Sequence, residues 1–378
     1  MHTVVLCRSV SKTSSKVSSP FTHALPYIQA HSGYVPGEQP KAHTVIKLNT
    51  NENPYPASPA VADALAKIRV EDLRRYPQAI AEDFRQIAAD VHGVDAENII
   101  PTNGGDELLR LALTTFVEVG DKIIVTQPTY SLYPVLAEVQ NCILEEIPLR
   151  DDWSIPADFA ESLIQSRAKM CILVNPHAPT GCLLPSAYIE KLVKSFEGVL
   201  VIDEAYVDFV DPKESYNCVP LIDSHENILI LRTLSKGYAL AGLRFGYGIS
   251  NKSLANPIMF KTRDSYNTDH VSQILACAAL QAQDHAQANW EKIRNSRSDL
   301  ITALNELGLV TGASQTNFVL VQVPANHSAI NISQALKDQN ILVRHFRQPR
   351  LEDKLRISIG TEKENRALLS ALRGVLQG

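Results

Sequence analysis

The chain has 378 residues, of which 45% are hydrophobic, and it carries a formal net charge of -5. This length is sufficient for a large hydrophobic core and two domains. The acidic balance argues against a nucleic-acid-binding surface, and no apolar run reaches the roughly 18 residues that a membrane-spanning helix needs.

The first fifty residues are predicted to contain little regular structure. Residues 1–20 carry three basic residues, many serines and no acidic residue, a composition that also occurs in transit peptides. Because this stretch is short and holds a single arginine, we expect a disordered extension instead. Residues 21–50 are expected to form an irregular N-terminal arm, because prolines and glycines interrupt any regular period. These residues are Pro26, Gly33, Pro36, Gly37 and Pro40.

Residues 51–265 alternate between short apolar runs and helical patterns. Seven runs are predicted to be strands: Ile99–Pro101, Lys122–Thr126, Cys142–Ile147, Met170–Val174, Val199–Ile202, Ile228–Leu231 and Arg244–Ile249. Several are continuous Val, Ile and Leu runs, as expected for strands that are covered on both faces. Helical patterns lie between them, for example at Glu107–Phe116 and Pro185–Phe196. The alternation predicts a large α/β domain with a mainly parallel sheet of seven strands.

Residues 266–378 have a different pattern, which predicts a smaller α+β domain at the C-terminus. Two long helical stretches lie within 271–288 and 290–307. The remaining predicted elements are a strand at Asn317–Val323, a helix at Ala329–Gln339, strands at Ile341–His345 and Leu355–Ile359, and a closing helix at Glu362–Leu376.

The six cysteines are scattered along the chain and include no Cys-x-x-Cys pair. The sequence therefore indicates neither a metal site nor a disulfide framework. Reduced thiols are typical of a cytoplasmic protein, which is the location we expect.

A lysine-containing segment after the sixth predicted strand carries the clearest chemical signal. It reads Arg-Thr-Leu-Ser-Lys-Gly-Tyr-Ala-Leu-Ala-Gly-Leu-Arg from Arg232 to Arg244, with Ser235 directly before Lys236. A lysine amine can form an imine with an aldehyde, while a neighbouring hydroxyl and a guanidinium bind a phosphate. Pyridoxal phosphate offers both groups. A solvated loop lysine is the alternative for an isolated Ser-Lys pair.

Other polar and aromatic residues follow separate predicted strands, which is where ligands bind in open α/β sheets. The turn from Gly104 through Gly105 to Asp106 leads into a helix whose free N–H groups can bind an anion, although an ordinary capped helix is the alternative. Tyr130 could stack on a pyridine ring or belong to the core. Asn175 begins a loop that is restricted by two prolines, and it could donate to the phenolate oxygen of the cofactor or form a simple turn.

Asp203 follows the buried run Val199–Ile202. A buried carboxylate is unfavourable unless it is paired, and a protonated pyridine nitrogen would be a suitable partner. Two unit charges about 4 Å apart attract by roughly 4 kcal/mol at an effective dielectric constant near 20. That attraction would keep the ring nitrogen protonated, so that the ring can accept electrons. Tyr206 could donate to the phenolate oxygen, and a helix-capping role is the alternative for Asp203.

Taken together, these segments resemble the histidinol-phosphate aminotransferases, a branch of the fold-type I pyridoxal-phosphate aminotransferases. The resemblance runs from about Tyr34 to near the C-terminus. It is carried by Tyr34-Val-Pro-Gly-Glu, Leu48-Asn-Thr-Asn-Glu-Asn-Pro-Tyr55, Arg75-Tyr-Pro77, Gly104-Gly-Asp-Glu107, Pro128-Thr-Tyr130, Asp203-Glu-Ala-Tyr206, the lysine segment, Arg263-Asp-Ser-Tyr-Asn267 and Leu355-Arg-Ile-Ser-Ile-Gly360.

The resemblance implies a role for each residue that would contact the cofactor. Lys236 would bind pyridoxal phosphate covalently, and Asp203 would pair with the ring nitrogen. Asn175 and Tyr206 would lie at the phenolate oxygen, with Tyr130 stacked on the ring. The residues that would surround the phosphate are Gly105, Asp106, Thr233, Ser235 and Arg244.

The resemblance also implies a homodimer and a substrate site. Tyr55 would reach the cofactor phosphate of the neighbouring subunit. Arg356 would bind the carboxylate of the amino-acid substrate, and Arg344 with Tyr34 would hold the phosphate of histidinol phosphate. Asn175 would also contact substrate.

The implied reaction is transamination between histidinol phosphate and 2-oxoglutarate in histidine biosynthesis. Aromatic aminotransferases and threonine-phosphate decarboxylases on the same fold are the alternatives, and a pyridoxal-phosphate-sensing regulator is a non-enzymatic one. One residue departs from the family pattern, because His177 stands where asparagine is usual. A backbone-shaping role would survive that change, whereas a direct side-chain contact would not.

Overall fold

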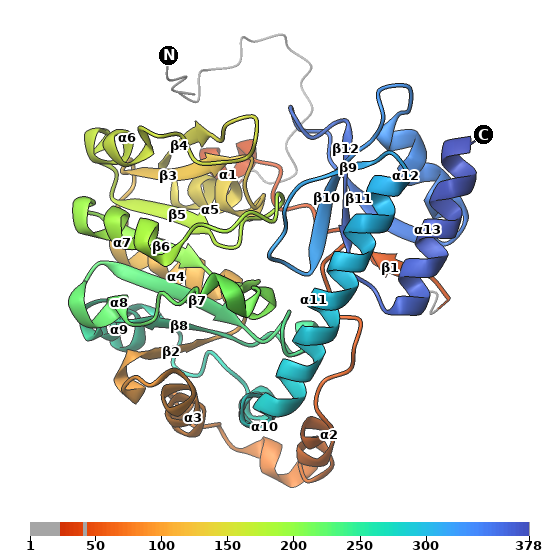
Figure 1. Ribbon diagram of the computed structural model, residues 1–378. Coiled ribbons are helices and arrows are strands. Elements are labelled where there is room, and N and C mark those ends of the chain that lie inside the picture. The colour runs from red at the N-terminus through yellow and green to blue at the C-terminus, as the bar shows by residue number, and fades with distance from the viewer. Residues whose placement is uncertain (1–22, 41–43, 378) are drawn as a thin grey trace.

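The computed structural model describes residues 23–40 and 44–377, which form a seven-stranded sheet and a five-stranded sheet that lie side by side (Figure 1). The prediction of a disordered extension at residues 1–20 falls outside these described residues. Within them, no helix combines the length and the apolar character that crossing a membrane would require.

The strand order of the larger sheet is β2-β8-β7-β6-β5-β3-β4. Its strands are β2 (Ile99–Thr102), β3 (Lys122–Gln127), β4 (Ile143–Pro148), β5 (Met170–Val174), β6 (Val199–Asp203), β7 (Ile228–Thr233) and β8 (Gly246–Ser250). Strand β8 runs antiparallel to β2 and β7, and the other neighbouring pairs are parallel. The prediction of a mainly parallel, seven-stranded sheet is confirmed.

Helices cover both faces of the larger sheet, which explains why its central strands, such as β5, are apolar and buried along their whole length. One face packs against α3 (Glu82–His92), α6 (Phe159–Ser166), α7 (Ser186–Ser195), α8 (Leu221–Ser224) and α10 (His270–Gln281). The other face packs against α4 (Gly105–Phe116), α5 (Leu132–Gln140) and α9 (Lys252–Pro257). Along β3, Ile124 belongs to the first core, whereas Ile123 and Val125 belong to the second. This alternation follows from the two-residue period of a strand.

The smaller sheet has the strand order β1-β11-β12-β10-β9. Its strands are β1 (Ile46–Leu48), β9 (Val310–Thr311), β10 (Phe318–Gln322), β11 (Ile341–His345) and β12 (Lys354–Ser358). The associated helices are α11 (Gln283–Glu306), α12 (Ala329–Asp338) and α13 (Glu362–Gln377). In Figure 1, α11 runs from α10, beside the larger sheet, to the smaller sheet. The boundary at residues 265 and 266 between two domains stays a prediction.

The N-terminal arm is more regular than its prolines and glycines suggested. It contains the short helix α1 (Pro26–Ala30), and its end forms β1, which pairs in parallel with β11 from Ile46 opposite Ile341 to Leu48 opposite Val343. The apolar side chains of β1 pack into the core of the smaller sheet. This tertiary pairing overrides the local turn signals that precede it.

The remaining helical segments are short. They are α2 (Pro59–Ala66), the 3-10 turns Val70–Arg74, Ala96–Asn98, Val207–Phe209, Pro212–Glu214 and Ala241–Leu243, and a π-helical turn at Ile258–Thr262.

Candidate active site

A cavity of about 610 Å³ is bordered by the carboxyl ends of the larger sheet's strands, the smaller sheet and the N-terminal arm. It brings together most of the residues that the sequence had singled out. Those that line it are Tyr34, Gly105, Asp106, Tyr130, Asp203, Tyr206, Thr233, Ser235, Lys236, Arg244, Arg344 and Arg356. Their assembly in one cavity follows from the rule that ligands bind beyond the carboxyl ends of the strands in open α/β sheets.

Lys236 reaches this cavity from the turn that follows β7. Its Nζ donates a hydrogen bond to the backbone carbonyl of Thr50 at 3.1 Å, and it lies 5.9 Å from the centre of the Tyr206 ring. Burial, together with the nearby positive charge of Arg356, lowers the pKa of the Lys236 amine to about 8. A lysine with a lowered pKa is neutral in more molecules near neutral pH, so it is a better nucleophile and base.

Asp203 ends β6 beside the cavity, and only 5% of its surface is exposed. One carboxylate oxygen accepts a hydrogen bond from the Tyr133 hydroxyl at 2.8 Å, and the other accepts from the Ala205 N–H at 3.0 Å. Because burial outweighs these hydrogen bonds, the pKa of Asp203 rises from 3.8 to about 6. A cation bound in the cavity would stabilise the ionised carboxylate.

Tyr206 lies next to the same strand end. Its hydroxyl accepts a hydrogen bond from the side-chain amide of Asn51 at 3.0 Å, and its ring packs edge-on against Phe318 at 5.1 Å between centroids. Burial raises the pKa of the Tyr206 hydroxyl, which therefore stays protonated and can donate to a ligand oxygen.

A candidate phosphate site lies where α4 begins. Gly104 has a φ of 76°, and a Cβ at that position would lie 2.7 Å from the Arg244 guanidinium, so the turn requires glycine. The Thr233 hydroxyl donates to Ser235 Oγ at 3.0 Å on the neighbouring turn. Free N–H groups at the start of a helix, two hydroxyls and the exposed guanidinium of Arg244 form a suitable site for a phosphate.

Two arginines from the smaller sheet carry positive charge into the cavity. Arg344 of β11 lies directly opposite Arg356 of β12 in the antiparallel register. The Arg356 guanidinium lies between the rings of Phe318 and Phe346, at 5.2 and 5.5 Å, and Arg344 lies 5.6 Å from Phe346. Burial lowers the pKa of Arg356, and the charge of Arg344 lowers it further.

Among the described residues, no carboxylate lies within 4.0 Å of either arginine, and Arg356 Nε is buried without a hydrogen-bond partner. Like charges directly opposite each other destabilise a sheet. The pair is therefore a candidate binding site for an anion.

Asn175 closes the loop that follows β5. Its amide nitrogen donates to the Leu184 carbonyl at 3.0 Å, and its amide oxygen accepts from the Leu184 N–H at 2.8 Å. One of its two amide N–H groups is left over after these contacts. Asn175 itself does not line the cavity, whereas Ala178 and Pro179 do. The role of Asn175 in cofactor and substrate binding stays a prediction.

His177, the departure from the family pattern, does not line the cavity either. Its ring nitrogens lie 2.8 Å from the Thr180 hydroxyl and 3.3 Å from the Thr126 hydroxyl. Burial lowers its pKa to about 4, so the ring is neutral near neutral pH. His177 shapes the loop and ties it to β3, which is a role that tolerates replacement of the usual asparagine.

Tyr55 does not line the cavity of its own chain. Its ring packs beside the smaller sheet's core, with Lys292 Nζ 5.1 Å from the ring centre. The prediction that Tyr55 completes the site of a neighbouring subunit stays a prediction.

Sequence reasoning missed several residues that organise the cavity. Tyr133, at the start of α5, follows Tyr130 by three residues, and its ring packs edge-on against that of Tyr130 with 5.5 Å between centroids. Its closeness in sequence to Tyr130 could have identified it as a neighbour of the same site. Asn51 was part of the segment that carried the family resemblance but was given no role. No local pattern indicated that Phe318 and Phe346 flank Arg356.

The comparisons with known proteins agree with this geometry. The family model described as aminotransferase class I and II matches residues 43–372. A histidinol-phosphate aminotransferase of Nostoc sp. is 42% identical over 351 residues, which are 93% of this chain and 97% of that protein. A solved histidinol-phosphate aminotransferase from Sinorhizobium meliloti, in complex with pyridoxal-5′-phosphate, matches with a TM-score of 0.85 at 25% identity and covers 95% of this chain and 99% of its own.

A likeness in fold alone extends to L-threonine-O-3-phosphate decarboxylase from Porphyromonas gingivalis, with a TM-score of 0.78 at 23% identity over 88% of this chain and 100% of that one. The fold and the family model define an aminotransferase of class I and II. Within that class, the chain belongs to the histidinol-phosphate aminotransferase family.

The residues of the cavity fit the cofactor of this family, pyridoxal phosphate. The buried carboxylate of Asp203 has no cationic partner among the described residues, and the start of α4 offers free N–H groups beside Arg244. Thr129 Oγ1, which also faces the cavity, is buried without a hydrogen-bond partner. These groups match a ring nitrogen that carries a proton and a phosphate that accepts hydrogen bonds.

Proposed function

We propose that the chain transfers the amino group of histidinol phosphate to 2-oxoglutarate, giving imidazole-acetol phosphate and glutamate in histidine biosynthesis. One observation carries the proposal. A single cavity holds a buried carboxylate without a cation, two arginines without an anion, and a lysine amine with a lowered pKa. A zwitterionic cofactor and an anionic amine substrate together satisfy all of these groups.

In this proposal, Lys236 supplies the covalent attachment for pyridoxal phosphate and then acts as the base. When bound, pyridoxal phosphate supplies an aldehyde that accepts the amino group and a ring that takes up the electron pair released when a proton leaves the substrate. The Lys236 amine removes the proton from the α-carbon of the amino substrate, and its lowered pKa makes this possible near neutral pH. Asp203 holds the proton on the ring nitrogen, and Tyr206 donates to the phenolate oxygen.

Substrate recognition is assigned to the arginine pair and the arm. Arg356 binds the carboxylate of glutamate, and its flanking Phe318 and Phe346 rings fix the plane of the guanidinium. Arg344 and Tyr34, which both line the cavity, hold the phosphate of histidinol phosphate. Both amino substrates therefore place an anion at the same end of the cavity.

We also propose that the protein is a homodimer in the cytoplasm with shared active sites. The surface near Tyr76 supports a subunit interface, since Tyr76 is 80% exposed yet stacks on Tyr266 with 4.4 Å between ring centres. Val70 and Leu73, on the 3-10 turn just before Tyr76, are 79% and 48% exposed. A cluster of large exposed apolar side chains marks an interaction surface.

A substrate panel tests the reaction. With 2-oxoglutarate as the acceptor, we expect glutamate to form from histidinol phosphate with a far higher kcat/KM than from histidinol, phenylalanine or threonine phosphate. Release of carbon dioxide from threonine phosphate would instead identify the decarboxylase alternative, and equal turnover of phenylalanine would contradict the assignment of Arg344 and Tyr34 to a phosphate.

Subunit mixing tests the shared site. Homodimers of Lys236→Ala and of Tyr55→Ala are each expected to be inactive or strongly impaired. A hybrid of the two contains one site with both native residues, so mixing should restore activity. No recovery, with hybrid formation verified by native mass spectrometry, would contradict a role for Tyr55 across subunits.

A further inference from the structure

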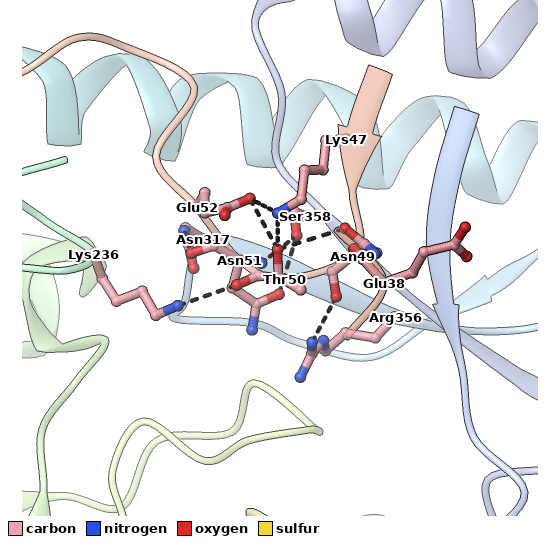
Figure 2. A network of polar contacts seen from close by, with 10 residues as sticks. All are labelled: Glu38, Lys47, Asn49, Thr50, Asn51, Glu52, Lys236, Asn317, Arg356 and Ser358. Atoms are coloured by element: carbon pink, nitrogen blue, oxygen red, sulfur yellow. Dashed lines mark hydrogen bonds and ion pairs between the residues drawn. The ribbon is translucent and has the colours of Figure 1, made fainter. Parts of the chain in front are cut away.

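A polar cluster that the reaction does not explain lies on the segment Asn49–Glu52, directly after β1 (Figure 2). Lys47 Nζ bonds to both the Thr50 hydroxyl and the Glu52 carboxylate, and the Thr50 hydroxyl donates to Glu52 at 2.8 Å. The Lys47 and Glu52 side chains are 20% and 38% exposed. This ion pair therefore lies partly inside the protein, where solvent screens its charges less than those of a surface pair.

The same segment contacts three functional side chains. The Thr50 carbonyl accepts a hydrogen bond from Lys236 at 3.1 Å, and the Asn49 carbonyl accepts one from Arg356 at 3.0 Å. The Asn51 amide donates to the Tyr206 hydroxyl at 3.0 Å. One short segment thus contacts the Lys236 amine, the Arg356 guanidinium and the Tyr206 hydroxyl and fixes their relative positions. Figure 2 shows the contacts with Lys236 and Arg356.

The Thr50 carbonyl is held from both sides. On one side, Lys47 and Glu52 bind the Thr50 side chain. On the other, the Asn51 N–H donates to Ser358 Oγ at 2.9 Å, and the Asn317 amide donates to the Asn51 carbonyl at 3.0 Å. Asn51 has a φ of 56°, in the left-handed region that asparagine tolerates better than most residues.

We propose that Lys47 and Glu52 are positioning residues for Lys236: they fix the Thr50 carbonyl that holds the free amine, and their paired charges set the field around it. The proposal rests on the role of Lys236 as the base described above. A lysine that leaves the cofactor needs a defined resting place from which to reach the substrate proton, and the Thr50 carbonyl provides the acceptor.

The two charges act on the amine in opposite directions. Of the groups that face Lys236, Glu52 raises its pKa, whereas Arg356, Lys47 and Arg244 lower it. The uncharged neighbours are the Thr50 carbonyl and the Tyr206 ring. Glu52→Gln leaves the positive charge of Lys47 unopposed, and Lys47→Met leaves the negative charge of Glu52 unopposed. The two substitutions must therefore shift the titration of Lys236 in opposite directions.

Chemical labelling of the amine measures this directly and needs no substrate. The full chain, freed of cofactor, is acetylated with isotope-labelled acetic anhydride across a pH series centred on about 8, and mass spectrometry quantifies the Lys236 peptide. We expect the midpoint to fall in Glu52→Gln and to rise in Lys47→Met, each by about half a pH unit or more. The double variant Lys47→Met/Glu52→Gln should return to the wild-type midpoint.

An ion pair far from the cavity provides the matched control. Lys194 and Glu190 are paired on the exposed side of α7, and Lys194→Met and Glu190→Gln should leave the Lys236 midpoint unchanged. Unchanged midpoints in both Lys47→Met and Glu52→Gln, or shifts in the same direction, would overturn the charge part of the proposal.

Turnover of the double variant tests the positioning part. For this test Glu52→Met takes the place of Glu52→Gln, because a glutamine amide oxygen still accepts from the Thr50 hydroxyl. The double variant Lys47→Met/Glu52→Met removes both charges and leaves the Thr50 hydroxyl without Lys47 and Glu52 as partners, so kcat should fall at least about tenfold while KM stays within about twofold. A wild-type kcat would overturn the positioning role. If the single variants do not fold, as judged by circular dichroism, the kcat of this double variant alone tests the positioning role. If the wild-type chain itself shows no transamination, the proposed function fails. The labelling result does not depend on that function, so the two failures can be told apart.

Discussion

Replacement of Asp203 by asparagine should make the cofactor-free protein more stable while it destroys function. The carboxyl group is almost fully buried, and its pKa is raised from 3.8 to about 6 by burial. Since one pKa unit corresponds to about 1.4 kcal/mol, ionisation of Asp203 opposes folding by about 3 kcal/mol at neutral pH. The substitution loses one of the two hydrogen bonds to the carboxylate, worth about 1 kcal/mol, so the expected net gain is about 2 kcal/mol.

The sign of the pH dependence makes this prediction specific. Between about pH 4 and pH 6 the unfolded chain has lost the Asp203 proton and the folded chain has kept it, so the wild type loses stability as the pH rises through this window. The Asp203→Asn variant has no carboxyl group to ionise at this position, so its stability does not fall for this reason between about pH 4 and pH 6. Urea unfolding of both cofactor-free proteins at about pH 4 and pH 7 measures the difference. The reasoning is refuted if the variant is less stable than the wild type at neutral pH, or if the difference between them does not grow with pH.

Three further predictions concern individual side chains of the cavity. Lys236→Ala should abolish turnover and the visible absorbance of the cofactor-loaded protein, and a variant that sustained multiple turnovers would contradict the role of Lys236. Arg356→Lys should lower kcat/KM for glutamate by about 10- to 100-fold, because a lysine cannot replace the two-pronged contact of a guanidinium with a carboxylate; an effect below about twofold would place the carboxylate elsewhere. Tyr133→Phe removes a hydrogen bond that favours ionised Asp203, so the pKa of Asp203 should rise. The affinity for the cofactor, measured by fluorescence titration, should then fall several-fold. Unchanged affinity would show that the hydrogen bond from the Ala205 N–H is enough to keep Asp203 competent for cofactor binding.

The parts of the fold that were predictable from the sequence are those with local signals. Runs such as Met170–Val174 and Val199–Ile202 are continuous and apolar, and the structure buries them between two layers of helices. Asp203 was identified because it directly follows such a run, and Lys236 because its segment, Arg232–Arg244, follows another. Their convergence in one cavity is a consequence of strand direction, which the alternation of strands and helices had already indicated.

The features that escaped prediction depend on tertiary contacts. Asn175 occupies the expected loop, and its amide closes that loop through the backbone of Leu184, nine residues further on, a contact that no local pattern indicated. The segment Ile46–Leu48 looked like the end of an irregular arm, and only its partner almost 300 residues later makes it a strand. The flanking of Arg356 by Phe318 and Phe346 likewise requires the register of strands that are far apart in the sequence.

The parallel pairing of β1 with β11 has a consequence for the order in which the molecule is assembled. During synthesis, the edge strand β1 is made early, but its pairing partner β11 is complete only once residue 343 has been added, when about nine tenths of the polypeptide exists. The carbonyl of Thr50 reaches its final place only after this late step, because Thr50 directly follows β1. A truncated nascent chain can therefore complete the larger sheet, yet it cannot present a finished catalytic centre to the cell.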